Sequence, residues 1–530
     1  MPLKPEAFDY EGVFPGRGGR GGRSRDADDV WPAGGKLKSF NDETFVPAPA
    51  SGPTAGLVAG ATGDPIGPVG PVGTNTKTDA SFVSKSADWI RRRGHTLSFA
   101  GLFIFSVILF VRPYELFPAL SGFRQMAFWT GLVTLIIYVG TQIALEGNLT
   151  ARPKEINLVL LIGLAALLSM PMAVDPGGAW ETFNDMLLKT IVIFIVIVNV
   201  VRTELRLKML IWLVLGVSIF LSLNAIQDYR AGVFATGEAE THTLRIGGRI
   251  GGLFGNSNDL ALHLVTMIPI AVGLGLSGRN PFKKLAYFGV TALMVGGVVV
   301  TFSRGGFIGL VAATFVLVRR LGKKNRVATT GALVFAVILF VAFAPGAFSS
   351  RLGTIFNSAS DLTGSSSQRT EVLKRSVLVA LRYPIFGVGI GNFHYKSPRN
   401  LETHNAYTQV AAELGLAAMV VYILFLTHPI RRMRLIEKES YEHRDRRRFY
   451  YLSVGLQASL VGFMFSSFFG AVAYQWYVYY LVGYAVCLHR LYLMKFPPED
   501  GFARNRWEHP FSKKTRKLIE GETAPEPNHV

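Results

Sequence analysis

Long apolar runs recur along most of this chain and constrain its fold more than any other feature. Only 17% of the 530 residues are charged, and the mean hydropathy is +0.31. Runs of roughly 17–22 residues, each able to cross ~30 Å of hydrocarbon, number about twelve. They lie near residues 97–113, 126–145, 156–172, 184–201, 208–225, 259–277, 285–302, 306–319, 328–345, 405–428, 449–469 and 475–493. We therefore predict an all-α, polytopic membrane protein.

The segments that flank these runs have a different composition. Residues 1–90 are rich in glycine, proline and serine, so we predict a disordered cytoplasmic tail. Its Arg-Gly repeats favour a solvated tail over a nucleic-acid-binding segment, and no nucleic-acid partner is expected. Residues 91–495 form the predicted transmembrane domain, and residues 496–530 a second cytoplasmic tail. The single cysteine, Cys487, excludes a disulfide framework and a thiolate metal site.

Basic residues alternate between successive loops and set the expected orientation. The arginines at 91–93 precede the first run, and the positive-inside rule places them in the cytoplasm. The basic loops that then fall on the same side lie at 152–154, 202–208, 279–284, 319–326 and 431–448. Both termini are therefore predicted to be cytoplasmic. The two long connections, 226–258 and 346–404, are predicted to be periplasmic, and long loops often carry function.

The loop 346–404 is unusually basic for a periplasmic segment. It holds seven lysines and arginines against three acidic residues, which an anionic ligand would explain. Part of it has the spacing of an amphipathic helix lying among lipid headgroups. Its apolar positions are Leu373, Val377, Leu378 and Leu381. On the opposite face, Lys374 and Arg375 are candidate substrate contacts.

A glycine-rich stretch, residues 249–259, runs directly into an apolar run. Asn256, Asn258 and Asp259 are able to cap the following helix and direct its amide dipoles toward an oxyanion. Arg249 could grip phosphate with two parallel hydrogen bonds. Composition alone supports an ordinary capped turn equally well.

Two further cations lie at the predicted periplasmic ends of apolar runs. Arg304 follows Ser303 between two runs with almost no loop, so it either faces the bundle interior or extends to the headgroups. Lys189 follows Asp185 by one helical turn and is either an ion-pair partner or a second phosphate contact.

His404 begins the tenth run, at the end of the basic loop. An imidazole with a pKa near neutrality could accept a proton from a sugar hydroxyl, although a histidine here could also be a plain helix cap. The periplasmic loops contain no dense carboxylate cluster, so no metal and no cofactor are expected. Arginines would then neutralise the substrate's charge.

The order of four segments resembles the O-antigen ligase and polymerase family of bacterial envelope glycan enzymes. These segments are 249–259, 301–310, 368–393 and 404–416. The resemblance implies a GT-C-like bundle with a long periplasmic loop carrying short helices. It also implies glycan transfer from undecaprenyl diphosphate, without metal, at the periplasmic face of the bacterial inner membrane. The acceptor would be lipid A core or another glycan. Arg249 and His404 match essential family residues, and the second essential arginine is either Arg304 or Arg369.

Two other readings remain open at this stage. A polysaccharide polymerase or a protein O-oligosaccharyltransferase would share these motifs and differ only in the acceptor. A small-anion transporter would instead place ionisable groups near the membrane midplane. The main charges within the predicted runs, Lys189 and Glu413, lie nearer the periplasmic end.

Overall fold

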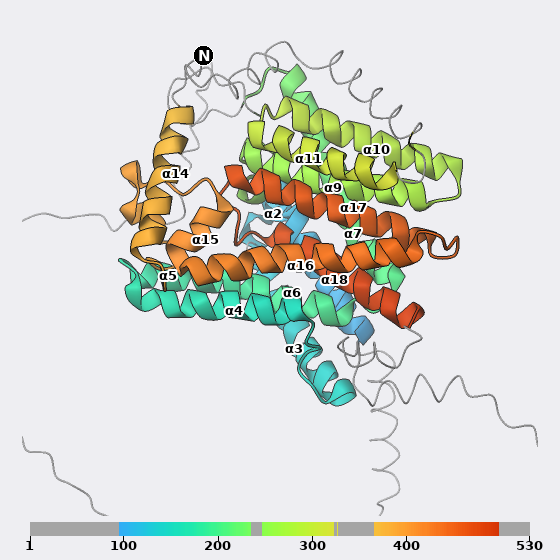
Figure 1. Cartoon of the computed structure of the whole chain (residues 1–530), viewed down its shortest axis with the longest axis horizontal. Helices are drawn as coiled ribbons and strands as arrows, with labels where there is room; N and C mark the ends of the chain where they lie inside the picture. The colour runs from blue at the N-terminus through green and yellow to red at the C-terminus, as the bar shows by residue number, and fades with distance from the viewer. Residues whose placement is uncertain (1–94, 124, 235–245, 323–325, 327–364, 498–530) are drawn as a thin grey trace, which may run out of the picture. The chain divides into compact units, whose positions relative to one another are not determined.

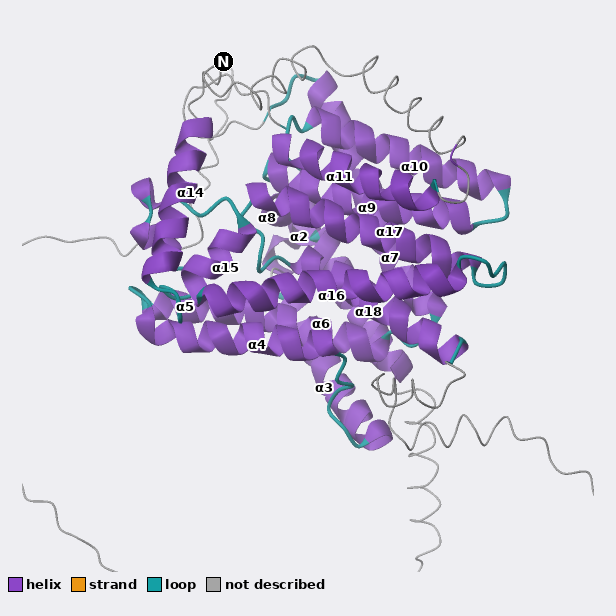
Figure 2. Ribbon diagram, in the orientation of Figure 1, coloured by secondary structure: helices purple, strands orange, loops and turns teal. Residues whose placement is uncertain are grey.

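The computed structural model describes residues 95–123, 125–234, 246–322, 326 and 365–497. Within these ranges the regular structure is entirely helical, as Figure 2 shows. The apolar run 328–345, Arg351, residues 1–90 and almost all of the predicted C-terminal tail lie outside the described residues.

Nine helices in the described ranges are long and apolar enough to cross a membrane. Five of them are single labelled helices: α3 (Met126–Glu146), α7 (Glu204–Arg230), α9 (Ser257–Ser277), α10 (Pro281–Val300) and α16 (Leu416–Ser440). The other four spans are His95–Leu116, which ends in α2 (Pro113–Leu116); Lys154–Met172, which contains α4 (Lys154–Ser169); Pro176–Val200, which contains α5 (Pro176–Thr182) and α6 (Lys189–Val200); and Arg447–Phe469, which contains α17 (Arg447–Ser466). Each overlaps a predicted run.

Two predicted runs form helices that are not among these nine. They are α11 (Arg304–Leu321) and α18 (Trp476–Lys495). Three arginines lie at the two ends of α11, and α18 is rich in tyrosine and contains His489 and Arg490. The three charged residues set α11 apart from the nine helices, and the polar residues of α18 lower its mean hydropathy. Twelve spans therefore stays a prediction.

The predicted run 405–428 is two helices, so its expected start was wrong. Gly415, with φ of 95°, separates α15 (Ala406–Leu414) from α16. A side chain at Gly415 would collide with the backbone of Ile385. The turn is fixed by a 2.8 Å hydrogen bond from the Leu416 amide to the Pro384 carbonyl oxygen. Only glycine adopts this backbone geometry without strain, which explains the break.

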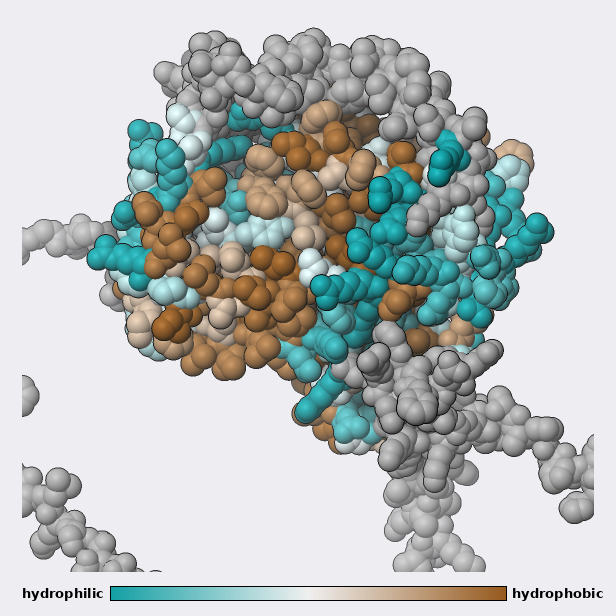
Figure 3. Space-filling model, in the orientation of Figure 1, coloured by the Kyte–Doolittle hydropathy of each residue, from teal (hydrophilic) through white to brown (hydrophobic). Residues whose placement is uncertain are grey.

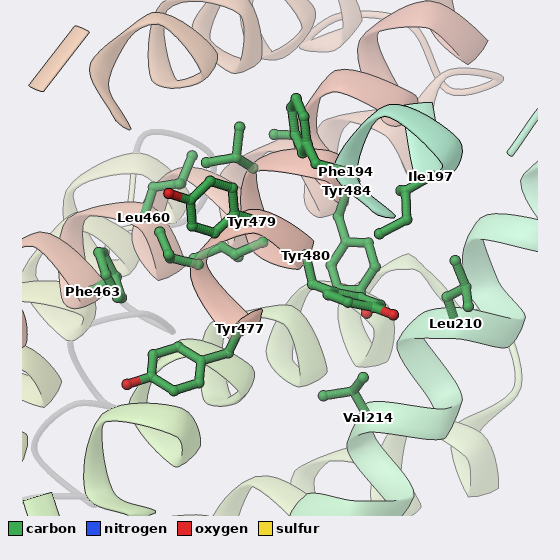
Figure 4. Close-up of a cluster of buried hydrophobic side chains, with 14 of the residues drawn as sticks. Phe194, Ile197, Leu210, Val214, Leu460, Phe463, Tyr477, Tyr479, Tyr480 and Tyr484 are labelled. Atoms are coloured by element: carbon green, nitrogen blue, oxygen red, sulfur yellow. The ribbon is translucent and has the colours of Figure 1, made fainter. Parts of the chain in front are cut away.

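The bundle is organised around α9 and α17, which pack against each other. Figure 1 shows them side by side, with α11 and α10 on one side and α16 on the other. Their spans are 83% and 72% buried, against 22% for α3. Figure 4 shows the aromatic core that α18 adds, in which Tyr479 meets Phe194 edge to face.

A series of contacts gathers several helix ends at one end of the bundle, which we call the motif end. Hydrogen bonds link Gly252 to Glu115, Asn258 to Ser303, Gly305 to Ser466 and Tyr407 to Met464. Ion pairs at the opposite end link Arg202 to Glu146, Lys495 to Glu204 and Arg320 to Glu437. On the face in Figure 3, hydrophobic residues dominate the middle, and hydrophilic ones gather toward the join of α16 and α17.

The predicted amphipathic helix is present as α14 (Ser365–Arg382). Figure 1 shows that it runs across the direction of α4 and α16. It packs against α15 and against two short turns, η5 (Phe393–Lys396) and η6 (Pro398–Asn400). All four of its predicted apolar positions are exposed: Leu373, Val377, Leu378 and Leu381. The predicted separation of apolar and basic faces is wrong, because Leu378 lines the same cavity as Lys374 and Arg375.

Candidate functional site

Arg249 is held by a bidentate ion pair with Asp228, near the end of α7. Its Nη2 lies 2.6 Å from Oδ1 of Asp228, and its Nε donates to Oδ2 at 3.3 Å. This hydrogen-bonded pairing raises the pKa of Arg249, so the guanidinium is charged. The Arg249 side chain is 51% exposed, against 15% for Asp228. The carboxylate thus orients a cation that solvent, and hence a ligand, is able to reach.

The backbone just after Arg249 forms the short helix α8 (Gly251–Phe254), which is anchored to the end of the first span. The Gly252 amide donates to Oε2 of Glu115 at 3.1 Å, and Glu115 pairs with Arg112 at 2.6 Å. A side chain at position 252 would collide with both residues. The glycine therefore permits this close approach. Arg112 and Glu115 were missed by the sequence analysis.

Asn258 and Ser303 join the first two motifs. Asn256 caps α9 by accepting from the Asn258 amide at 2.8 Å, as predicted. The Asn258 side chain in turn accepts from the Ser303 hydroxyl at 2.8 Å. Ser303 also caps α11, because its oxygen accepts from the Gly306 amide at 3.1 Å. Half-buried Arg304 is the first residue of α11 and therefore lies next to this junction.

His404 directly precedes the cap of α15 and is not the cap itself. That role belongs to Asn405, whose side chain accepts from the amides of Tyr407 and Thr408 at 2.9 and 3.1 Å. His404 has a φ of 48°, in the left-handed region that a non-glycine residue seldom adopts. Such geometry often marks functional positions. The plain-cap reading of His404 is thus wrong.

An electrostatic interaction between two carboxyl groups links this third motif to the first one. Asp259, in the first turn of α9, interacts electrostatically with Glu402, two residues before His404. Glu402 reaches solvent although protein surrounds it on most sides. Its partial burial raises its pKa, and nearby His394 partly offsets this rise. The sequence analysis noted Glu402 only as one of several scattered acids.

The other predicted residues lie on different elements. Lys189 pairs with Asp185 at 2.7 Å, so the predicted ion pair is present. Arg369 lies on α14, as do Lys374 and Arg375, which line a cavity of about 540 Å³. Arg249, Arg304 and His404 are not among its lining residues. Within the described ranges, no group of three or more His, Cys, Asp or Glu side chains is arranged to hold a metal ion.

Comparison with known proteins supports the family resemblance. Residues 289–423 match a family model described as O-antigen ligase. The matched segment contains Ser303, Arg304, α14 and His404, and it begins after the Arg249 motif. No curated protein matched the chain. The match supports the O-antigen ligase and polymerase family, and an enzyme that acts on glycans in a membrane.

Proposed function

We propose that this chain, with its O-antigen ligase match over residues 289–423, is a membrane glycosyltransferase. It moves a glycan from a polyprenyl-diphosphate carrier to a lipid or glycan acceptor, at the periplasmic face of the bacterial inner membrane. The observation that carries this proposal is the hydrogen bond between Asn258 and Ser303. It joins the Arg249 motif to the start of α11, so two arginine-bearing segments meet at one end of the bundle.

The proposed reaction is a single displacement. The acceptor hydroxyl attacks the anomeric carbon, a new C–O bond forms, and the bond to the carrier diphosphate breaks. Arginines held in place before reaction stabilise the negative charge that grows on the leaving diphosphate. Arg249 suits this role because Asp228 already fixes its orientation. The attack inverts the anomeric centre.

His404 is the proposed acceptor of the hydroxyl proton. An unperturbed imidazole titrates near neutral pH, which suits a general base. The cap of α15 is Asn405 rather than His404.

The proposed orientation places the motif end in the periplasm. It is supported by the basic segments of the opposite end, above all residues 431–448, which run from the last turns of α16 through the connection to the start of α17. A reporter active only in the periplasm should give signal when fused after Ser366 and none when fused after Lys438. The reverse pair of results would contradict the orientation and the site together.

The reaction is tested with purified full-length protein and an undecaprenyl-diphosphate-linked glycan. We expect transfer without added metal and in the presence of a chelator. His404→Ala should abolish transfer and leave donor binding nearly intact, because the arginines that bind the ground state remain. The matched control is His443→Ala, an exposed residue between α16 and α17, which should retain full activity.

Each other result contradicts a specific part of the proposal. Inhibition by chelator would contradict the metal-free mechanism, and full turnover by His404→Ala would place the base elsewhere. Mass spectrometry of the product would identify the acceptor, which separates a ligase from a polymerase or a protein O-oligosaccharyltransferase. Transport of a small anion into liposomes, with no glycan transfer from any lipid-linked donor, would contradict the proposal that this protein is a glycosyltransferase.

A further inference from the structure

The cavity beside α14 carries an excess of positive charge. It holds about 540 Å³ and is lined by Glu371, Lys374, Arg375, Leu378, Tyr395, Lys396, Ser397 and Pro398. Three of these side chains are cationic and one is anionic. Neither Lys374 nor Lys396 forms an ion pair with any described residue. Two unpaired ammonium groups at one cavity favour an anionic ligand.

The walls of the cavity are fixed to each other and to the bundle. Arg375 Nε donates to the Lys396 carbonyl oxygen at 2.7 Å, which ties α14 to η5. The Tyr395 hydroxyl donates to Asp175, the cap of α5, at 3.3 Å. These bonds hold Lys374 and Lys396 on facing elements. The Ser397 hydroxyl is buried and makes no hydrogen bond to a described residue.

The rim of the cavity continues into an exposed apolar stripe on α14. Leu378 lines the cavity and is 59% exposed, and Leu381, one turn farther along, is 63% exposed. Because α14 runs across the direction of the spans, we expect this stripe to lie along the membrane surface rather than through it. A ligand that contacts both surfaces would have a charged headgroup and a hydrocarbon portion.

We propose that this cavity binds a phosphate ester carried by a lipid. The phosphate lies between Lys374 and Lys396, and the hydrocarbon lies along Leu378 and Leu381. Phosphate fits because its oxygens accept charge-assisted hydrogen bonds from both ammonium groups. Two sources share this chemistry: a phosphorylated lipid-anchored acceptor and a phospholipid of the surrounding leaflet. The first source rests on the proposed glycan transfer, and the second does not.

Binding is tested first, with the full chain in detergent and short-chain phosphatidic acid as the probe. Replacing Lys374 and Lys396 together by glutamine should weaken binding roughly tenfold, since two charge-assisted contacts are lost. The control Arg382→Gln removes an exposed cation of α14 that does not line the cavity, and it should leave binding unchanged. Thermal unfolding of each variant verifies folding. Equal binding by the double variant and the wild type would overturn the proposal.

Two competitors test the ligand class. The matching diacylglycerol lacks the phosphate and should not displace the probe, whereas inorganic phosphate should displace it only weakly. Displacement by diacylglycerol as effective as by phosphatidic acid would overturn the phosphate contact. Equally effective displacement by inorganic phosphate would overturn the lipid contact.

A transfer assay then identifies the source. If the acceptor carries the phosphate, the double variant should raise KM for the acceptor at least severalfold and leave kcat and KM for the donor unchanged. Unchanged acceptor KM together with weakened phosphatidic acid binding would assign the cavity to a leaflet phospholipid. A wild-type protein that binds phosphatidic acid and transfers no glycan would contradict the proposed function but not this site.

Discussion

The Ser303 hydroxyl donates a 2.8 Å hydrogen bond to the Asn258 side chain, and this bond joins the start of α9 to the cap of α11. Each residue also takes part in the cap of its own helix: the Asn258 amide donates to the Asn256 side chain, and the Ser303 oxygen accepts from the Gly306 amide. One polar contact therefore sets the relative position of two helix N-termini, whose amide dipoles favour an anion.

A double-mutant cycle should reveal this coupling. Asn258→Ala and Ser303→Ala should each lower the free energy of unfolding, and their combination should cost about 1 kcal/mol less than the sum, because the shared hydrogen bond is lost only once. Thermal or denaturant unfolding measures the cycle. Ser277→Ala, at the far end of α9, should combine additively with Ser303→Ala. Additive effects in the Asn258 cycle would refute the coupling.

Asp228 should matter for catalysis through Arg249. Asp228→Ala leaves the guanidinium unoriented, so we expect a loss of transfer of roughly tenfold or more. In an Arg249→Ala background the same change should add almost nothing, because there is no longer a guanidinium to orient. Arg249→Lys should also fail, since lysine lacks the planar fork. Steady-state kinetics test this cycle, with Asp445→Ala at the opposite end as the control. Independent losses would assign Asp228 a different role.

The sequence predicted the features of this site that depend on local spacing. Asn256 is a cap because a short polar side chain precedes an apolar run, and α14 is a helix, as the spacing of its leucines indicated. Asp228, Glu115 and Glu402 could not be predicted in this way. Their partners lie far away in the sequence, and only the tertiary packing of the chain brings these groups together. The break at Gly415 was missed because the flanking residues on both sides are apolar.

Glu402 should make the stability of the protein depend on pH. Burial raises its pKa in the folded state, so the folded protein binds this proton more tightly than the unfolded chain. Stability from this group is therefore present at acidic pH and declines as pH rises through the folded-state pKa. Glu402→Gln removes the decline, so its Tm relative to wild type should increase as pH rises above about 4.3, the ordinary pKa of a glutamate side chain. A Tm difference that is constant with pH would contradict this.

Replacing Gly415 should destabilise the fold. Alanine there meets both the unfavourable φ of 95° and the backbone of Ile385, so Gly415→Ala should cost on the order of 2 kcal/mol or more. Gly140, inside α3, is the matched control because a side chain there would contact nothing within 4 Å. Gly140→Ala should be neutral or slightly stabilising. Thermal unfolding distinguishes the two, and equal Tm values would show that the turn tolerates a side chain.

The central position of α9 also constrains how the protein is made. α9 enters the membrane early, yet one of its main packing partners, α17, is synthesised long after it. Until then, the surface of α9 that α17 will cover must face either lipid or the insertion machinery. Glu402, which interacts electrostatically with Asp259, also belongs to a later segment. A nascent chain that ends before residue 404 consequently carries Arg249 and Arg304 but no His404, so under the proposed mechanism it lacks the base until most of its helices have been synthesised.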